Sequence, residues 1–355
     1  VQASAGDVTI TGSVLTDNHA EAVNGGTRGG ALEVTNGRLT ITDSVISDNS
    51  VSGTSTVSGG AIAIGSGAAT IHCSMISGNR GSGGRALGGA LFLGSGVLEI
   101  TESTFYDNAA SGTSDSEGGA IRHASGTLTI AGTTLTENRA RAGGAIFSDV
   151  GPATVVNSTI SGNTATGSGG GGIYSYYSGL TVVNSTITGN AAVNNIGGGV
   201  YWYNADYYNV EITIENSIIA GNAADIAAND FTFGYGAPIV RNSLIGDNEG
   251  TGLAEAQSGD SNGNFIGSSA GSGVMDPLLG PLAFNGGPTQ THALLAGSLA
   301  IDAGDNTRAV DSGGAALTAD QRGAPFARIV NTTVDMGAFE RAPLPVTVLL
   351  VDNSI

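Results

Sequence analysis

The sequence NSTISGNTATGSGGGGIY occupies residues 157–174, and NSTITGNAAVNNIGGGVY occupies residues 184–201. Both stretches have eighteen residues and place their asparagines, a glycine pair and a final tyrosine in register. A catalytic loop is seldom duplicated within one chain, whereas a structural unit that packs against its own copies has to be. The duplication therefore indicates a repeat protein.

A short phrase that ends in asparagine recurs along most of the chain. It has the form Ser/Thr-x-(Ile/Leu/Phe)-x-x-Asn and appears nine times, at intervals of 25 to 32 residues. Asparagine tolerates left-handed turns, and stacked amide side chains can hydrogen-bond to one another. The phrase predicts an asparagine ladder made of Asn18, Asn49, Asn79, Asn108, Asn138, Asn163, Asn190, Asn222 and Asn248.

Two further phrases lie between these asparagines. Short alternating runs such as Leu98-Glu-Ile100 precede the Ser/Thr phrases, and alternation with a period of two is typical of strands. No window of a dozen residues shows helical periodicity. Glycine pairs followed by a small or branched apolar residue open at Gly29, Gly59, Gly88, Gly118, Gly143, Gly171 and Gly198.

These phrases together predict the fold. A unit of about thirty residues cannot bury its apolar face alone, so its copies must stack into a β-solenoid. The predicted fold class is all-β, a right-handed single-stranded parallel β-helix of about nine to eleven coils. We expect residues 1–250 to form the β-helix repeats, residues 251–340 to continue and close the β-helix, and residues 341–355 to form a proline-bounded tail strand.

Alternation assigns side chains to the core or to the surface. The residue three positions before each asparagine, such as Ile76, is predicted to point inward. The position after the inward residue of the glycine phrase carries Glu33 and Arg122, so it is predicted to face outward. Three large side chains are placed in that outward position and are expected to be exposed: Phe92, Phe147 and Trp202.

Aromatic residues are concentrated in two adjacent coils. An exposed patch that contacts a glycan or another partner is one interpretation, and core filling with a loop decoration is the other. The patch is predicted to consist of Trp202, Tyr177, Tyr207 and Tyr208. The tyrosines predicted to point toward the core are Tyr174, Tyr176, Tyr201 and Tyr203.

Composition limits the partners and the compartment. The 355 residues include 59 glycines and carry a net charge of −18, which argues against nucleic-acid or anionic-membrane partners. The single cysteine, Cys73, excludes an internal disulfide framework, and no apolar run is long enough to span a membrane. The chain starts at Val1 without a signal-type apolar segment, so we expect a processed extracellular protein.

The residues that could support chemistry are scattered. Asp17 and Asp48 precede ladder asparagines on adjacent coils and could approach the spacing of a glycosidase pair, but aspartate is also a common turn residue. We predict no catalytic residues and no cofactor. Isolated Ca²⁺ binding at Asp302 and Asp305 stays open. The histidines show no metal-ligand spacing, so no metal site is predicted from His19, His72, His123 and His292.

Two stretches resemble known families. The alternation of Gly-Gly-Ala-(Ile/Leu) with tetrapeptides such as FYDN at 105–108 resembles the repeats of the polymorphic outer-membrane proteins, roughly over residues 8–250. Residues 276–306, DQRG at 320–323 and VDMGAFE at 334–340 resemble the closing segment of choice-of-anchor Q bacterial surface proteins. These resemblances imply a β-helical protein of the bacterial cell surface, often with an adhesive role.

The last residues suggest how the protein is used. After Pro343 and Pro345, an apolar run with strand propensity could pair with the first coil of another copy, head-to-tail. We therefore predict a non-enzymatic structural or adhesive solenoid that assembles with itself into a filament, with possible glycan partners. A polysaccharide lyase or glycosidase is the alternative. The predicted assembly strand includes Val346, Val348, Leu350 and Val351.

Overall fold

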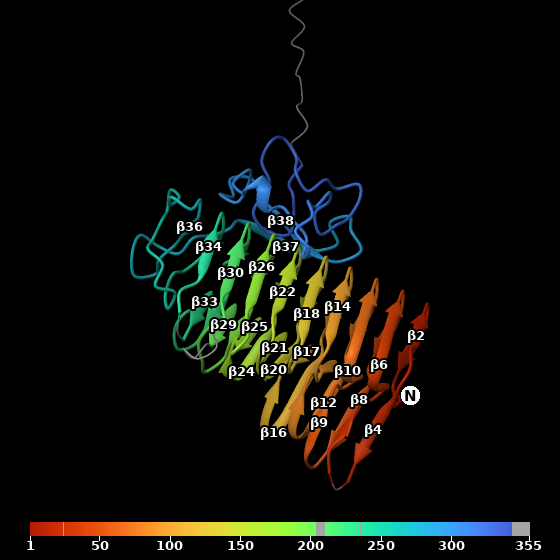
Figure 1. The fold of residues 1–355 in the computed structure, drawn as a ribbon. Helices are drawn as coiled ribbons and strands as arrows, with labels where there is room; N and C mark the ends of the chain where they lie inside the picture. Colours follow the sequence, from red (N-terminus) through yellow and green to blue (C-terminus); the bar gives the residue numbers. More distant parts are fainter. Residues whose placement is uncertain (24, 204–209, 235, 343–355) are drawn as a thin grey trace, which may run out of the picture.

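A computed structural model describes residues 1–23, 25–203, 210–234 and 236–342. Three parallel sheets of sixteen, ten and ten strands run along the molecule, and Figure 1 shows their strands side by side from the red first coil to the green last coils. We call them sheets A, B and C. All 34 strand pairings of the described residues are parallel except that of the two-stranded sheet β37–β38. The prediction of an all-β parallel solenoid is confirmed.

Each sheet collects one strand type of the repeat. Sheet A contains β1 (Gln2–Ala3), β2 (Val8–Thr11), β6 (Leu32–Thr42), β10 (Ile62–His72), β13 (Leu91–Leu93), β14 (Val97–Thr101), β17 (Ile121–His123), β18 (Thr127–Ala131), β21 (Ile146–Ser148), β22 (Ala153–Val156), β25 (Ile173–Tyr176), β26 (Leu180–Val183), β29 (Val200–Tyr203), β30 (Ile212–Glu215), β33 (Phe231–Phe233) and β34 (Ile239–Arg241). Sheet B contains β3 (Val14–Thr16), β7 (Val45–Ser47), β11 (Met75–Ser77), β15 (Thr104–Tyr106), β19 (Thr134–Thr136), β23 (Thr159–Ser161), β27 (Thr186–Thr188), β31 (Ile218–Ile219), β35 (Leu244–Ile245) and β36 (Phe265–Ile266). Sheet C contains β4 (His19–Ala22), β5 (Thr27–Arg28), β8 (Ser50–Gly53), β9 (Thr56–Ser58), β12 (Arg80–Leu87), β16 (Ala109–Glu117), β20 (Arg139–Ala142), β24 (Thr164–Gly169), β28 (Ala191–Ala192) and β32 (Ala223–Ala224).

The corners between sheets depend on left-handed backbone. In one coil, Glu102 (φ 48°) joins sheet A to sheet B, and Asp107 (φ 50°) joins sheet B to sheet C. Gly59 (φ 64°) begins the glycine pair, and a Cβ on the following Gly60 would lie 1.9 Å from the carbonyl oxygen of Gly89. The glycine pair is therefore required because the backbones of adjacent coils approach closely at this corner.

The core lies between the sheets and is continuous along the solenoid. The residues predicted to point inward, such as Ile76, Phe105 and Leu135, are fully buried and belong to one apolar cluster. At the first coil, Leu15 is only partly buried but packs against the same cluster. The inward assignment of this column is therefore confirmed.

The asparagine ladder is present from Asn18 to Asn222. In each step, the side-chain Nδ2 of one asparagine donates to Oδ1 of the asparagine on the next coil, at 2.8 to 3.0 Å. The ladder ends differently from the prediction. Asn222 donates to Oδ1 of Asp230, while Asn248 donates to the carbonyl of Leu253 and lies outside the ladder. Asp230 takes the ninth position because its side chain supplies the acceptor that Asn248 was expected to provide.

A second ladder of hydroxyl groups runs along the corner between sheets A and B. The backbone N–H of Ser44 donates to Oγ of Ser74, and Ser74 repeats the contact with Ser103 on the following coil. Each hydroxyl also donates to the carbonyl two residues earlier, as Ser74 does to His72. The pattern continues from Ser13 to Ser243, where Asn264 accepts the last bond. The two ladders therefore give the repeated polar groups of these two corners hydrogen-bond partners on the adjacent coil.

The outward position of sheet A is more covered than the sequence predicted. Phe92 and Phe147 are 8% and 7% exposed, so their predicted exposure is wrong. The guanidinium of Arg28 lies over Phe92 and that of Arg122 lies over Phe147, at 5.9 and 4.7 Å from the ring centroids. Glu117 in turn holds Arg122 through a charged hydrogen bond. Cationic side chains therefore cover these rings.

The predicted side-chain directions in two coils are reversed. Val200 pairs with Ile173, so Trp202 pairs with Ser175 in an inward position and is only 1% exposed. Tyr174, Tyr176, Tyr201 and Tyr203 alternate with these buried residues, point outward and are half-buried. The strand pairing aligns Gly143 of the preceding coil with Gly170 and Gly197, one position before the predicted Gly171 and Gly198. A one-residue shift exchanges the two faces of a strand.

The C-terminal residues turn back over the solenoid. Within the stretch expected to continue the β-helix, β36 adds one strand to sheet B. From Asp276 onward the chain covers the outer side of the later strands of sheet B, to which it is hydrogen-bonded. Figure 1 shows this blue segment beside the later coils, beyond the ends of β22, β26 and β30. We call residues 276–342 the lid. It contains β37 (Leu279–Ala283), β38 (Thr291–Leu294) and the 3-10 helix η1 (Asn306–Arg308).

Buried polar contacts attach the lid. Gln321 accepts from Thr159 at 2.6 Å and donates to Thr134 at 2.9 Å. Arg328 is fully buried and donates through Nη2 to Oδ1 of Asn184 and to two carbonyl groups of the lid. In the described residues, no helix has the length and apolar character that crossing a bilayer requires.

Candidate functional site

The tyrosines of β25 and β29 form an aromatic surface on the outside of sheet A. Tyr174 stacks on Tyr201 with ring centroids 4.7 Å apart, and Tyr176 stacks on Tyr203 at 5.4 Å. Tyr177 contacts Tyr176 at 4.1 Å. We call these five residues the tyrosine surface. They stack because parallel pairing places equivalent residues of adjacent coils directly beside one another.

Packing fixes the rings of the tyrosine surface. Tyr174 also packs on Phe147 at 4.9 Å, and burial raises the pKa of the Tyr174 hydroxyl. Burial likewise raises the pKa of Tyr201. Both hydroxyls are therefore neutral donors and acceptors at physiological pH. Each stacked pair hides one face of each ring, so ring edges and hydroxyls are what the surface offers to a partner.

The residues predicted to form a contact patch lie in different environments. Trp202 is buried, and its Nε1 donates to the carbonyl of Ser178 at 2.9 Å. Tyr177 belongs to the tyrosine surface and has a left-handed backbone (φ 52°). Tyr207 and Tyr208 lie outside the described residues, as do the predicted assembly residues Val346, Val348, Leu350 and Val351.

The acidic residues before the ladder asparagines are turn residues. Asp17 and Asp48 have left-handed backbones (φ 55° and 56°) and are exposed at the corner between sheets B and C. Asp305 is the N-cap residue of η1. Its Oδ1 accepts from the backbone N–H of Thr307, and its Oδ2 pairs with Arg308. Asp302 and Asp305 do not belong to any group of three metal-ligating side chains in the described residues.

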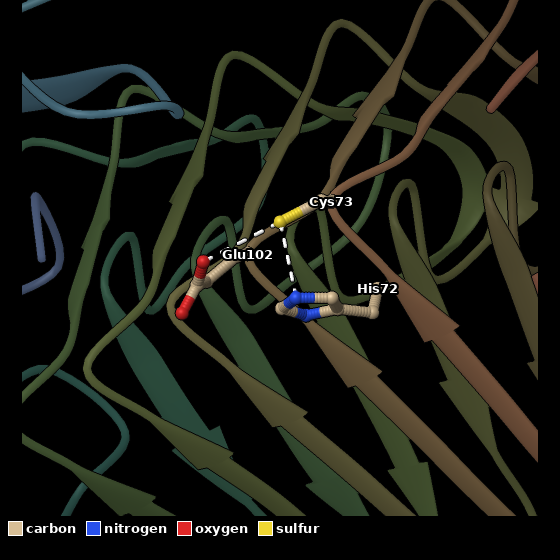
Figure 2. A group of neighbouring side chains, drawn as sticks. All are labelled: His72, Cys73 and Glu102. Carbon is tan, nitrogen blue, oxygen red and sulfur yellow. Dashed lines mark hydrogen bonds between the residues drawn. The ribbon is translucent and has the colours of Figure 1, made fainter. Parts of the chain in front are cut away.

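One such group does occur in the part of the chain that the structure describes. His72, Cys73 and Glu102 place three ligand atoms within 4.8 Å of one another, at the corner between sheets A and B. Figure 2 shows the Cys73 thiol between the other two side chains. Its Sγ lies 3.2 Å from Nε2 of His72 and 3.5 Å from Oε2 of Glu102. We call these residues the His–Cys–Glu group.

The surroundings of the thiol are acidic. Partial burial, a hydrogen bond to Glu102 and the charges of Glu102 and Asp43 raise the pKa of Cys73 to about 11. The Cys73 thiol is therefore neutral at neutral pH, and a nucleophilic cysteine would need the opposite pKa shift. Glu102 also lines a cavity of about 400 Å³ between this corner and the lid, together with Asn157 and Gln321.

Parallel stacking explains the meeting of these residues. Thr42, His72 and Thr101 are paired across β6, β10 and β14, so the corner residues that follow them fall in one column. The column contains Asp43, Cys73 and Glu102. Their spacing in the sequence is that of the repeat rather than of a local metal motif. Alignment of the three residues before each Ser/Thr phrase would have revealed the column.

The coiled parallel architecture defines a right-handed β-helix repeat protein. A family model described as the right-handed beta helix region matches residues 1–210 and 88–270, which together span residues 1–270 of the chain. The protein belongs to this family. No curated protein and no solved structure matches the chain. Family membership establishes the fold, and the activity has to be argued from the site.

Proposed function

We propose that this protein is a non-enzymatic β-helix of the bacterial cell surface with a structural and adhesive role, and that the tyrosine surface contacts glycans. The observation that carries the proposal is the stacking of Tyr174 on Tyr201 and of Tyr176 on Tyr203 on the outer face of sheet A. Five tyrosines on two adjacent coils form a larger aromatic area than isolated surface residues do.

The chemistry of the tyrosine surface suits a glycan. Tyrosine provides a large amphipathic contact area at low cost in conformational entropy, because it has only two side-chain torsions. Stacking and the contact of Tyr174 with Phe147 order these rings before a partner arrives. Ordered phenol hydroxyls can donate to and accept from sugar hydroxyl groups.

The two ladders suit a structural role. The asparagine ladder connects eight coils from Asn18 to Asn222, and the hydroxyl ladder runs beside it. Buried amide and hydroxyl groups that all have partners rigidify a core and hold it in one arrangement. A rigid rod keeps a contact surface at a fixed distance from its point of attachment.

A glycan array tests the adhesive part of the proposal. We expect the full chain to bind a subset of glycans, and we expect Tyr201→Ala and Tyr203→Ala each to weaken this binding at least tenfold. Tyr106→Ala is the matched control, because Tyr106 is 42% exposed on sheet B, away from the tyrosine surface. Equal binding by all variants, or none by the wild type, would contradict the proposal. Shortening of the bound glycans would show an enzyme instead.

Head-to-tail assembly is the second part of the proposal. In the described residues, β3 and β4 each pair with a neighbouring strand on one side only, and Val8 and Ile10 of the first coil are partly buried. Leu253 and Ala256 pack on the core at the other end, so coils of two copies cannot simply stack end to end. Donation of strand 346–351 to the first coil avoids that obstacle.

Electron microscopy tests assembly independently of glycan binding. We expect the full chain to form filaments at high concentration, and we expect a chain lacking residues 343–355 to remain as separate rods. Filaments formed equally by both proteins would show that the tail strand is not the donor. Separate rods of both proteins would contradict head-to-tail assembly, and the proposed function would then be that of a monomeric adhesive protein.

A further inference from the structure

We propose that His72, Cys73 and Glu102 form a binding site for one zinc-class divalent metal ion on the surface of the solenoid. This inference is independent of the glycan contact, because the His–Cys–Glu group lies at the corner between sheets A and B, and the tyrosine surface lies on other coils. It also revises the expectation that the histidines belong to no metal site.

The separations between the side-chain atoms fit a tetrahedral metal ion. Zinc bonds of about 2.3 Å to sulfur and about 2.0 Å to nitrogen or oxygen place neighbouring ligand atoms about 3.5 Å apart. Sγ of Cys73 lies 3.2 Å from Nε2 of His72 and 3.5 Å from Oε2 of Glu102. The ligand atoms of His72 and Glu102 lie within 4.8 Å of each other. Rotation of these two side chains toward the thiol therefore has to bring them to the distance that a shared ion requires.

The combination of ligands selects the class of metal. Thiolate and imidazole favour zinc and related transition metals over Ca²⁺ and Mg²⁺, which prefer ligand sets of oxygen atoms alone. Three protein ligands leave a fourth position for water or for another carboxylate. Asp43 precedes Cys73 by one coil in the same corner column, and its backbone N–H donates to the carbonyl of His72 at 3.2 Å.

A contact behind the imidazole orients His72 for binding. Nδ1 of His72 lies 2.9 Å from the hydroxyl oxygen of Thr101, its partner on the next strand. When Nδ1–H donates to this hydroxyl, Nε2 presents its lone pair toward the thiol. Metal-binding histidines commonly hold their second ring nitrogen in such a hydrogen bond.

The backbone of this corner fixes the directions of the ligand side chains before a metal ion binds. Left-handed backbones at Cys73 (φ 46°) and Glu102 (φ 48°) set the direction of both side chains. The hydroxyl ladder fixes the residues that follow, because Ser74 N–H donates to Oγ of Ser103. On binding, a metal–sulfur bond replaces the S–H bond of Cys73, and the proton passes to solvent.

Metal titration of the full chain tests the site. In a buffer with a phosphine reductant, we expect calorimetry to find one Zn²⁺ per chain. Co²⁺ should produce thiolate-to-cobalt charge-transfer absorption. Cys73→Ser should lower Zn²⁺ affinity at least 100-fold and abolish that absorption, and Glu102→Gln should lower the affinity at least tenfold. Thr101→Val should lower it about tenfold through the orientation of His72.

Control variants keep the test decisive. His19→Asn changes an exposed histidine outside the group and should leave Zn²⁺ affinity unchanged. Each variant alters only side chains at a surface corner, so we expect it to fold. Circular dichroism of the metal-free variants checks this. Asp43→Asn distinguishes the fourth ligand, because a loss of affinity assigns that position to Asp43 rather than to water. Absence of saturable Zn²⁺ binding, or equal binding by Cys73→Ser, would overturn the proposal.

Discussion

At the scale of single residues, Asp230 is the most unusual member of the asparagine ladder. It accepts from both the backbone N–H and the side-chain Nδ2 of Asn222, each at 2.9 Å. It is 3% exposed, and burial raises its pKa to about 7. An acid thus ends a column that otherwise consists of neutral amides, so the ladder has one end that responds to pH.

The raised pKa predicts how stability depends on pH. Between pH 4 and pH 7 the folded chain holds a proton on Asp230 that the unfolded chain has lost, so the free energy of unfolding falls as pH rises through this range. We expect the difference in unfolding free energy between the wild type and Asp230→Asn to fall by on the order of 4 kcal/mol from pH 4 to pH 8.

Denaturant titration at several pH values measures this difference. The subtraction removes the contributions of groups that titrate in both proteins. Burial and the charge of Arg122 lower the pKa of His123 to about 4, and burial raises the pKa of Glu340 to about 7. A difference that stays constant with pH would show that Asp230 is ionised in the folded protein.

Trp202 gives a second prediction at this scale. Its side chain is 1% exposed and its Nε1 has a partner in Ser178, so Trp202→Ala should lower the free energy of unfolding by about 3–5 kcal/mol. The neighbouring half-buried Tyr203 is the control, and Tyr203→Ala should cost less than half as much. Denaturant unfolding measures both, and equal losses would contradict the inward position of Trp202.

At the scale of elements, the asparagine ladder connects each corner of sheets B and C to the next. Asn108 donates to Oδ1 of Asn138 and to the carbonyl of Ile76, and its own Oδ1 accepts from Asn79. One side chain therefore supports three consecutive coils. Removing it leaves buried donors and acceptors without partners, which is costlier than the loss of an exposed hydrogen bond.

The ladder predicts different effects for two asparagines of the same sequence phrase. Asn108→Ala should lower the free energy of unfolding by about 2–4 kcal/mol, because buried polar groups of Asn79 and Ile76 lose their partners. Asn248→Ala should cost about 1 kcal/mol, because among the described residues the side chain of Asn248 makes one hydrogen bond, to the carbonyl of Leu253. Thermal unfolding of both variants provides the comparison, and similar losses would contradict the end of the ladder at Asp230.

Sequence reasoning succeeded where the period alone determines the structure. The stacked parallel strands, the inward column of Ile76 and Phe105, and the ladder from Asn18 to Asn222 follow from spacing, because a solenoid repeats each position on every coil. It failed at the extra glycines of residues 169–172 and 197–199. There the choice of the glycine that aligns with Gly143 of the preceding coil shifts the register by one residue and exchanges core and surface.

The candidate sites depend on contacts that the repeat does not determine. The exposure of Phe92 depends on Arg28, which comes from another strand and cannot be located by periodicity. The His–Cys–Glu group uses single occurrences of histidine and cysteine within an otherwise ordinary corner column. The lid folds back over strands that precede it by more than a hundred residues, and only tertiary packing determines such a contact.

At the scale of the whole molecule, the lid divides sheet B into two parts. Its later strands are covered, and Thr134, Thr159 and Thr186 are buried against the lid. Its earlier strands expose Val14 and Met75, at 68% and 41%. The solenoid therefore has a free side near its first coils and a covered side near its last coils, as Figure 1 shows.

The attachment of the lid predicts a local effect on hydrogen exchange. Gln321 is 2% exposed and bonds to Thr134, Thr159 and Thr289, so Gln321→Ala should weaken attachment by about 2–3 kcal/mol. Amide exchange should accelerate within residues 276–342, while exchange of the first coils stays unchanged. Gln257→Ala, at an exposed position outside the lid, should have no effect. Uniform acceleration along the chain would contradict a separately attached lid.

Distances between spin labels on the outer side of sheet C test the central claim, that successive coils stack in parallel. The pairings 19–50–80–109–139–164–191–223 place four coil steps between His19 and Arg139 and seven between His19 and Ala223. With cysteines at these exposed positions in a Cys73→Ser background, the account predicts separations of about 19 Å and about 34 Å, the multiples of a 4.8 Å strand spacing. Separations that do not increase in proportion to the number of coils would contradict it.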